Sequence, residues 1–423
     1  MKKLFTLILA VMLACGMFSA ASFAAAKSPF QYSLNPDGTA EITTADRKLR
    51  DGNIPAELDG HTVTSIGWSA FNGCDSLTDV TLPDTVTRIR NLAFANCKNL
   101  KSINIPDSLT VLDTAVFSNS PRLASIRISP NHPTFVFNND MLIRKEDMAL
   151  LKYTGQKAGA YEVFWGIRTI GSGAFENSKL TSVVLPETVT VIEDYAFRLM
   201  KGLKEITLPD SLASIGGQVF LGTGLTSIKL PAGLTHISFG TFSWCSKLKT
   251  IEVDPANPVF EMQGNSLINK KENALVFHLD FDKGTYEIPD GIEKIQSGAF
   301  QGSKAIRELI MPDSVKEIGD SAFSGTSGLA VVRFSRNLAA IDRYAFSYCE
   351  GLKSVTIPDG VTTIPASAFG GCRNLAEIIL PAGVTEIAPS AFEGCKKLTV
   401  KAPAGSYAER FCKENSIPFA ELK

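Results

Sequence analysis

Apolar residues recur in columns along most of the chain, with a period of 22 or 23 residues. The most regular column is phenylalanine. Ile or Leu precedes each of these phenylalanines by five residues, and Leu or Ile follows it by five or six. A fixed period of this length is the signature of stacked repeat architectures, so each interval is interpreted as one structural unit. The repeat phenylalanines, evenly spaced apart from two intervals of 58 residues, are Phe71, Phe94, Phe117, Phe175, Phe197, Phe220, Phe242, Phe300, Phe323, Phe346, Phe369 and Phe392.

Within a unit, the pattern predicts two short strands followed by a turn. In residues 352–358, Val355 and Ile357 alternate with polar residues, as expected for a strand with one buried face, and Pro358 ends it. A second β segment follows at 361–364, and the Ala-Phe step then turns the chain back. One unit cannot bury its apolar face alone, so stability must come from stacking. The sequence therefore predicts a β-rich solenoid of about twelve coils.

The two 58-residue intervals predict a matched pair of insertions, at about 130–163 and 255–288. They align without gaps at an offset of 125 residues, for example Phe135 with Phe260 and Tyr161 with Tyr286. Each is expected to contain a β-hairpin whose first arm is Met141–Arg144 or Ser266–Asn269. Two interpretations remain open: the hairpins are spacers within the array, or they border a ligand groove.

The N-terminus resembles a secretory signal over residues 1–26. Lys2 and Lys3 precede an apolar stretch at 4–18, and small residues up to Ala24 and Ala26 offer cleavage sites. A retained anchor and lipidation at Cys15 are the alternatives. We therefore expect an exported protein, extracellular or at the cell surface, with the periplasm as a further possibility. The expected domains are an N-terminal cap at 27–53, the solenoid at 54–403 and a C-terminal cap at 404–423.

The charge balance argues against a nucleic-acid partner. The chain has a formal charge of −1, and removal of Lys2 and Lys3 with the leader takes it to −3. Binding to nucleic acid requires a basic surface that releases counterions, and no Lys/Arg run is present. No second long apolar segment follows the leader, so we expect no membrane insertion of the mature chain.

The repeat unit resembles the BspA-like class of leucine-rich repeats. Its pattern is I/L-P-x-x-V/L-T-x-I-x-x-x-A-F-x-x-C-x-x-L-x-x-V/I-x-I/L-P, and it covers about 54–403. The segments at 54–67 and 404–419 are similar to the entry and closing segments of that family. The resemblance implies a leucine-rich repeat array of about twelve coils with two hairpin insertions.

This family includes adhesins, which implies a secreted or cell-surface protein that binds a protein or glycan on a host or neighbouring cell. The alternative is a structural envelope component without a dedicated ligand. The oligomeric state is left open.

No catalytic, cofactor or metal site is predicted, and we do not expect an enzyme. Six cysteines lie three residues after a repeat phenylalanine, where other units carry small or adaptable residues, so buried free thiols are favoured over disulfides or metal ligands. Cys412, in the closing segment, is the first candidate for pairing. The four histidines are scattered, and no catalytic motif is present. Aspartates after the strand-ending prolines are expected to serve turns rather than calcium.

The exposed face of the first strand in each coil is the predicted partner-binding surface. Its outward positions are mostly small or charged, which plain solubility also explains, but some are apolar or arginine, a residue enriched at interfaces. The candidate residues are Arg127, Val184, Glu252, Ile310, Arg333 and Ile379.

Overall fold

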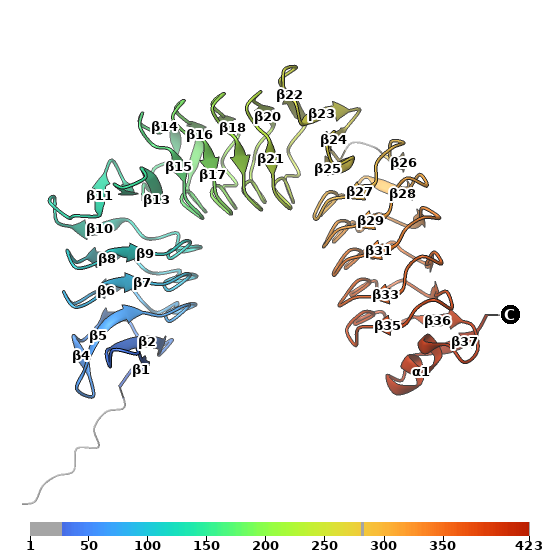
Figure 1. The fold of residues 1–423 in the computed structure, drawn as a ribbon, viewed down its shortest axis with the longest axis horizontal. Coiled ribbons are helices and arrows are strands. Elements are labelled where there is room, and N and C mark those ends of the chain that lie inside the picture. Colours follow the sequence, from blue (N-terminus) through green and yellow to red (C-terminus); the bar gives the residue numbers. More distant parts are fainter. Residues whose placement is uncertain (1–27, 281–282, 423) are drawn as a thin grey trace, which may run out of the picture.

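The computed structural model describes residues 28–280 and 283–422, which form a continuous stack of coils bent into an arc (Figure 1). The predicted β-solenoid is confirmed. The predicted signal segment, its cleavage sites and Cys15 lie outside the described residues. Within the described ranges, no helix is both long and apolar enough to cross a bilayer.

The first strand of each coil stacks into a row that runs along the outer side of the arc (Figure 1). Neighbouring strands pair in parallel wherever pairing is regular, for example Ile103 with Ile126. We call this the long-strand row. Its members are β3 (Asp51–Asn53), β6 (Asp79–Thr81), β8 (Ser102–Ile105), β10 (Ser125–Ile128), β14 (Gly159–Glu162), β16 (Leu180–Val184), β18 (Glu205–Thr207), β20 (Ser227–Leu230), β22 (Thr250–Val253), β26 (Gly284–Glu287), β28 (Ile306–Ile310), β30 (Val331–Arg333), β32 (Ser354–Thr356), β34 (Glu377–Ile379) and β36 (Thr399–Ala402).

The second β segment of each coil forms a row that lies nearer the inner side of the arc (Figure 1). Most of its strands are two residues long, because the Ala-Phe turn begins directly after the buried Ile or Leu. We call this the short-strand row. Its members are β2 (Ala40–Ala45), β5 (His61–Ile66), β7 (Arg88–Ile89), β9 (Val111–Leu112), β13 (Ala149–Tyr153), β15 (Thr169–Ile170), β17 (Val191–Ile192), β19 (Ser214–Ile215), β21 (His236–Ile237), β25 (Ala274–His278), β27 (Lys294–Ile295), β29 (Glu317–Ile318), β31 (Ala340–Ile341), β33 (Thr363–Ile364) and β35 (Glu386–Ile387).

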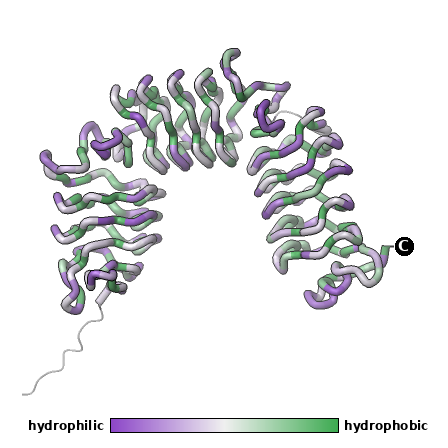
Figure 2. Tube along the Cα trace, in the orientation of Figure 1, coloured by the Kyte–Doolittle hydropathy of each residue, from purple (hydrophilic) through white to green (hydrophobic). Residues whose placement is uncertain are grey.

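The repeat phenylalanines form the centre of the core. All twelve are buried, and their rings stack from coil to coil at centroid distances such as 4.8 Å for Phe300–Phe323 and 5.4 Å for Phe346–Phe369. Burial of one such side chain contributes roughly 2–3 kcal/mol, so the stability of the array is distributed over many equivalent positions. Figure 2 shows hydrophobic segments recurring at matching places in successive coils.

Caps close both ends of the stack. At the N-terminus, β1 (Phe30–Leu34) pairs antiparallel with β2, and β4 (Glu57–Leu58) pairs with β5. At the C-terminus, α1 (Tyr407–Glu414) begins at Ser406, whose side chain accepts a hydrogen bond from the Glu409 N–H, and buries Phe411. The last strand, β37 (Phe419–Glu421), extends the long-strand row.

Each 58-residue interval contains a three-stranded antiparallel meander. In the first, β11 (Phe135–Asn138) pairs with β12 (Met141–Arg144), which pairs with β13. In the second, β23 (Phe260–Gln263), β24 (Ser266–Asn269) and β25 follow the same order. The arms Met141–Arg144 and Ser266–Asn269 are each preceded by a strand that the sequence analysis did not include. The last strand of each meander enters the short-strand row, and β14 or β26 enters the long-strand row.

The insertions act as wedges that bend the arc. Each adds a layer of strands on the strand sides of the stack but adds no Ala-Phe turn. At the turns, the flanking coils therefore stay in contact. The Gly240 N–H donates to the Ser297 carbonyl at 3.0 Å, and the Asn119 N–H donates to the Glu176 carboxylate at 2.7 Å. Figure 1 shows straight blocks of coils that meet at bends where the insertions lie, with the turns on the concave side.

Candidate binding surface

The six residues predicted as a binding surface lie in the long-strand row, on the outer side of the arc (Figure 1). Each is at the corresponding position of a different strand, and these strands belong to five separate sheets. Arg127, Val184, Glu252 and Arg333 are exposed, whereas Ile310 and Ile379 are half-buried. The fold therefore distributes these residues along the whole arc and does not gather them at one place.

The two arginines of that group have partners within the row. Arg333 forms an ion pair with Glu308 at 2.8 Å, and Arg127 donates to the Ser102 hydroxyl at 2.9 Å. Both pairs join neighbouring coils. Exposed pairs of this kind contribute roughly 0–1 kcal/mol, so they are consistent with a solvated surface. Partner binding at this face stays a prediction.

The Ala-Phe turns form a second continuous surface, which lines the concave side of the arc. We call it the turn face and define it as the residues from three before to two after each repeat phenylalanine. The residue two positions after the phenylalanine has a positive φ in every coil, and the residue two positions before it does so in eleven of the twelve. These left-handed positions suit Gly and Asn, and bulky side chains there are strained.

Several turn-face positions carry large aromatic side chains instead. Trp244 and Tyr348 follow their repeat phenylalanine by two residues, and Tyr195 and Tyr344 precede it by two, all with φ between 56° and 62°. Phe239 precedes its phenylalanine by three. Trp244 is 46% exposed, Phe239 44% and Tyr348 60%. A strained backbone that holds an exposed aromatic ring adds nothing to the core, so it indicates a role at the surface.

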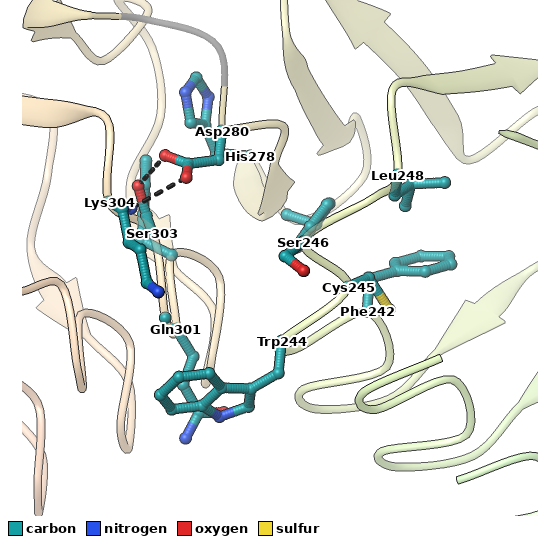
Figure 3. Close-up of a pocket in the computed structure, with 13 residues that line it drawn as sticks. Phe242, Trp244, Cys245, Ser246, Leu248, His278, Asp280, Gln301, Ser303 and Lys304 are labelled. Carbon is teal, nitrogen blue, oxygen red and sulfur yellow. Dashed lines mark hydrogen bonds between the residues drawn. The ribbon is translucent and has the colours of Figure 1, made fainter. Parts of the chain in front are cut away.

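Two of these rings, Trp244 and Phe239, lie where the coils that flank the second insertion meet at their turns. We call this place the second junction and its counterpart at the first insertion the first junction. Trp244 lies over the glycines of the next two coils: a Cβ on Gly302 or Gly325 would come within 2.7 or 2.9 Å of its ring. Figure 3 shows the indole below a cleft that lies between its own coil and the coil of Gly302. The cleft has a volume of about 160 Å³. Ser303 and Lys304 lie on one wall, with Asp280 above them, and Ser246 lies opposite.

A second pocket, of about 350 Å³, lies on the other side of the same turns. Phe239, Gln301, Asp320 and Ser321 line it together with Gln218, Ser297 and two glycines. Gln301 lines both pockets, so the two hollows share one wall. A further pocket of about 520 Å³ surrounds Tyr344 and Tyr348 and is lined also by Arg373, Glu393 and Lys396.

The first junction has the same backbone but different chemistry. At the offset of 125 residues, Asn119 takes the place of Trp244, Glu176 that of Gln301 and Asn177 that of Gly302. Glu176 has a fully buried side chain. It accepts hydrogen bonds from the Ser118 hydroxyl and the Asn119 N–H and pairs with Arg198 at 3.2 Å. Asn72, Asn96, Asn119 and Asn177 add a ladder of amide hydrogen bonds across this junction.

The cysteines serve the core. The seven in the described part of the chain carry free thiols, and in five coils the thiol donates to the carbonyl of the preceding coil's repeat phenylalanine, as Cys97 does at 3.1 Å. Ser120 and Thr326 make the same bond with hydroxyls, which explains why Cys, Ser and Thr interchange here. Burial raises the pKa of Cys245 to about 11, so this thiol is protonated at neutral pH.

A buried serine–histidine pair lies in the second insertion. The Ser266 hydroxyl hydrogen bonds with His278 Nδ1 at 3.0 Å and also contacts the Tyr286 hydroxyl. His278 stacks on Phe300 at 5.0 Å, at the position where Tyr153 packs at a tilt against Phe175 in the first insertion. Ser266 is fully buried, so a substrate cannot reach its oxygen. Among the described residues, no group of three His, Cys, Asp or Glu side chains is arranged to hold a metal ion.

The aromatic residues of the turn face were missed by the sequence analysis. It assigned the binding surface to the exposed strand face alone. The signal was present in the repeat itself, since Trp244 and Tyr348 replace Gly or Asn at a column where most coils have one of the two. Recognising it required the φ angle at that column.

Comparison with known proteins supports the repeat assignment. The family model described as BspA type Leucine rich repeat region (6 copies) matches residues 52–144, 168–273 and 274–399. A leucine-rich cell surface protein from Faecalibacterium prausnitzii is 30% identical, with 90% of this chain and 95% of that chain covered and a TM-score of 0.56.

Two further solved structures are similar. A leucine-rich repeat protein from Bacteroides ovatus is 26% identical over 93% of this chain and 98% of that chain, with a TM-score of 0.40. The pneumococcal vaccine antigen PcpA shares the fold at 16% identity, with 94% and 98% of the chains covered and a TM-score of 0.53. No curated protein matches the sequence.

Proposed function

The chain belongs to the BspA-type leucine-rich repeat family, and from this premise we propose that it is an exported cell-surface protein that binds a partner through its turn face. The partner is a macromolecule of a host or neighbouring cell. The proposal rests on one observation above all: exposed aromatic side chains occupy left-handed positions of the turn face, where Gly or Asn would be free of strain.

The shape of the array supports this proposal. A standard interface buries about 800 Å² on each partner, and a concave surface that runs along the whole arc offers more than that. Trp and Tyr are the residues most enriched among those that dominate binding energy. Trp68, Tyr195, Trp244, Tyr344 and Tyr348 are distributed along this one surface, whereas the tyrosines of the long-strand row, Tyr161 and Tyr286, pack against the core.

The location at the cell surface draws on two observations. Residues 1–26 have the charged, apolar and small-residue order of a secretory signal. The relative from F. prausnitzii is described as a cell surface protein. An array exposed outside the cell would present its concave side to large partners without any movement of the backbone.

The test compares two faces of the same protein. Labelled protein would be applied to immobilised extracellular-matrix proteins and to intact bacterial and epithelial cells, and saturable binding measured. The turn-face variant combines Phe239→Thr, Trp244→Asn and Tyr348→Asn. The matched strand-face variant combines Arg127→Ala, Val184→Thr and Arg333→Ala.

We expect the turn-face variant to bind at least about tenfold more weakly and the strand-face variant to bind as the parent does. Loss of binding in the strand-face variant alone would move the site to the outer side of the arc. Absence of saturable binding to every surface would contradict the proposal and favour a structural envelope component.

A further inference from the structure

We propose that the second junction is a carbohydrate-binding subsite that takes a neutral saccharide lying across Trp244 and Phe239. This inference rests on the proposed function and names the chemistry of the partner at one place on the turn face. It is drawn from two exposed aromatic rings, two adjoining pockets and the polar side chains that line them.

The indole of Trp244 is held as a flat platform. Its ring lies across Gly302 and Gly325, where any Cβ would displace it. The glycines therefore fix the ring from below and leave its other side open, in keeping with its 46% exposure. A pyranose has one face made mainly of C–H groups, and such a face packs against an exposed aromatic ring of this kind.

Phe239 supplies a second aromatic surface on the same coil. Its ring lies against Gly217 of the preceding coil, where a Cβ would come within 2.6 Å of it, and it lines the pocket of about 350 Å³. The two rings flank the turn that contains Phe242. A saccharide that lies along the turn face can therefore contact both rings without entering the core.

Polar side chains line both pockets beside the two rings. Gln301 lines both pockets, and its amide can donate and accept hydrogen bonds at once. Asp320 and Ser321 line the Phe239 pocket, and Asp280 and Ser303 line the Trp244 cleft. Pairs of hydroxyls on adjacent sugar carbons suit carboxylates and amides of this type.

The charges argue against other ligands. Asp280 and Lys304 balance each other in the Trp244 cleft, and Asp320 is the charged residue that lines the Phe239 pocket. Neither pocket therefore carries the net positive charge that favours a phosphate of nucleic acid or of a phospholipid headgroup. The cleft of about 160 Å³ is smaller than a typical small-molecule site, so it cannot enclose an acyl chain. An uncharged ligand with many hydroxyls satisfies both pockets.

A second aromatic ring lies over a glycine of the turn face beyond this subsite. Tyr348 occupies the same turn position as Trp244 three coils further on, and its ring lies over Gly371. Stacked coils advance by roughly 4.8 Å, which is close to the advance of one sugar unit in an extended glycan. The second ring is thus placed to meet the same chain a few sugars away.

The test uses Trp244 as its own reporter. Replacing the exposed residues Trp68 and Trp165 with Phe leaves Trp244 as the only tryptophan. The protein would first be screened on a microarray of neutral and acidic oligosaccharides. The fluorescence of Trp244 would then be titrated with the oligosaccharides bound. We expect saturable changes in emission with neutral sugars and an affinity on the order of tenfold weaker after Phe239→Thr.

Matched variants separate the outcomes. Trp165 is 77% exposed and lies outside the turn face, so Trp165→Thr in the parent chain removes an exposed aromatic side chain without touching the subsite, and it should leave sugar binding unchanged. Trp244→Asn, which installs the first-junction residue, should weaken sugar binding on the order of tenfold in calorimetry. Sugar binding that survives both Trp244→Asn and Phe239→Thr would overturn the inference.

Failure here differs from failure of the proposed function. Absence of binding to every sugar on the array, together with saturable cell binding that resists enzymatic removal of surface glycans, would overturn the carbohydrate subsite and leave the turn face as a protein-binding surface. Loss of cell binding on removal of the glycans would support the subsite.

Discussion

The two junctions are built on one backbone plan, but the space between their turns is filled differently. Both insertions contribute a meander and one strand to each row, and both leave the flanking turns in contact. At the first junction, Glu176 and the asparagine ladder bridge the turns with hydrogen bonds, and the pocket that remains between the turns has a volume of only about 30 Å³. At the second, Trp244, Gln301 and Gly302 leave two pockets. The backbone of the two junctions is therefore the same, while the side chains that line their turns differ.

The same contrast extends into the cores of the insertions. Lys152 of the first is buried and corresponds to Phe277 of the second, whose ring packs at a tilt against Phe242 with the centroids 5.4 Å apart. His132 and Asn257, a second matched pair, make equivalent contacts instead. They differ in type, yet each accepts two backbone N–H groups and contacts a proline carbonyl of the preceding coil. A comparison of matched positions therefore distinguishes residues whose hydrogen bonds hold the backbone, such as His132 and Asn257, from residues whose chemistry differs between the insertions, such as Lys152 and Phe277.

Removing one wedge should produce the largest change. Deletion of residues 129–163 restores a 23-residue spacing between Phe117 and Phe175, so the coils on either side should stack directly. The bend at the first junction should disappear, and the maximum dimension in small-angle X-ray scattering should increase despite the shorter chain. A folded variant that keeps the parent curvature would show that the coils themselves bend the arc.

The second largest expected difference between the two junctions is the loss of stability when the buried carboxylate of Glu176 is removed. Glu176→Ala leaves the Ser118 hydroxyl and the Asn119 N–H without their acceptor, and we expect it to lower the free energy of unfolding by on the order of 4 kcal/mol. Gln301→Ala, at the matched position, should cost less than about 1 kcal/mol. Urea denaturation of both variants measures the contrast, which equal losses would abolish.

The buried lysine gives a pH-dependent difference. Burial lowers the pKa of Lys152 to about 8, while the charge of Glu176 opposes this shift. The unfolded value is near 10.4, so between about pH 8 and pH 10.4 the unfolded chain binds more protons, and the Lys152 contribution to stability rises with pH. Lys152→Met should therefore stabilise the protein by about 3 kcal/mol at pH 7.

This gain should vanish above about pH 10.4, where the lysine is neutral in both states. Urea denaturation of parent and variant at pH 7 and pH 10.5 checks it. The ionisation of thiols exposed on unfolding affects both proteins equally. A gain that is independent of pH would mean that Lys152 carries no charge penalty in the folded protein.

The smallest expected effect concerns strain at the turn face. Asn tolerates the left-handed backbone better than Trp, so Trp244→Asn should raise the free energy of unfolding by about 1 kcal/mol. Asn119→Trp, the reciprocal change, should lower it and also break the amide ladder. Thermal denaturation of the pair provides the measurement. Destabilisation by Trp244→Asn would identify the indole as a packing residue.

The repeating part of the fold is readable from the sequence because identical columns lie in identical surroundings. The Phe and Ile/Leu columns predict the stack, and the Pro after each first strand predicts its end. The extra strands β11 and β23 were not expected, because their pattern lacks the repeat. The concave turn face could not be deduced, since it depends on insertions that thicken the strand sides and spare the turns.

The binding residues were harder to predict for a related reason. Arg127 and Arg333 stand out in the sequence as exposed arginines, but their partners Ser102 and Glu308 lie on neighbouring coils. Trp244 appears in the sequence as an isolated aromatic residue. Its importance depends on its left-handed backbone and on Gly302 and Gly325, which lie 58 and 81 residues further along the chain.

Hydrogen exchange on the bound protein tests the central claim most directly. The protein would be measured by mass spectrometry free and attached to the surface that it binds, and the protection of each segment compared. If the partner binds the turn face at the second junction, we expect slower amide exchange at 239–246 and 297–303 in the bound protein. The matched first-junction segments 114–121 and 172–178 should change little. Protection confined to β16, β28 and β34 on the outer side of the arc would contradict it.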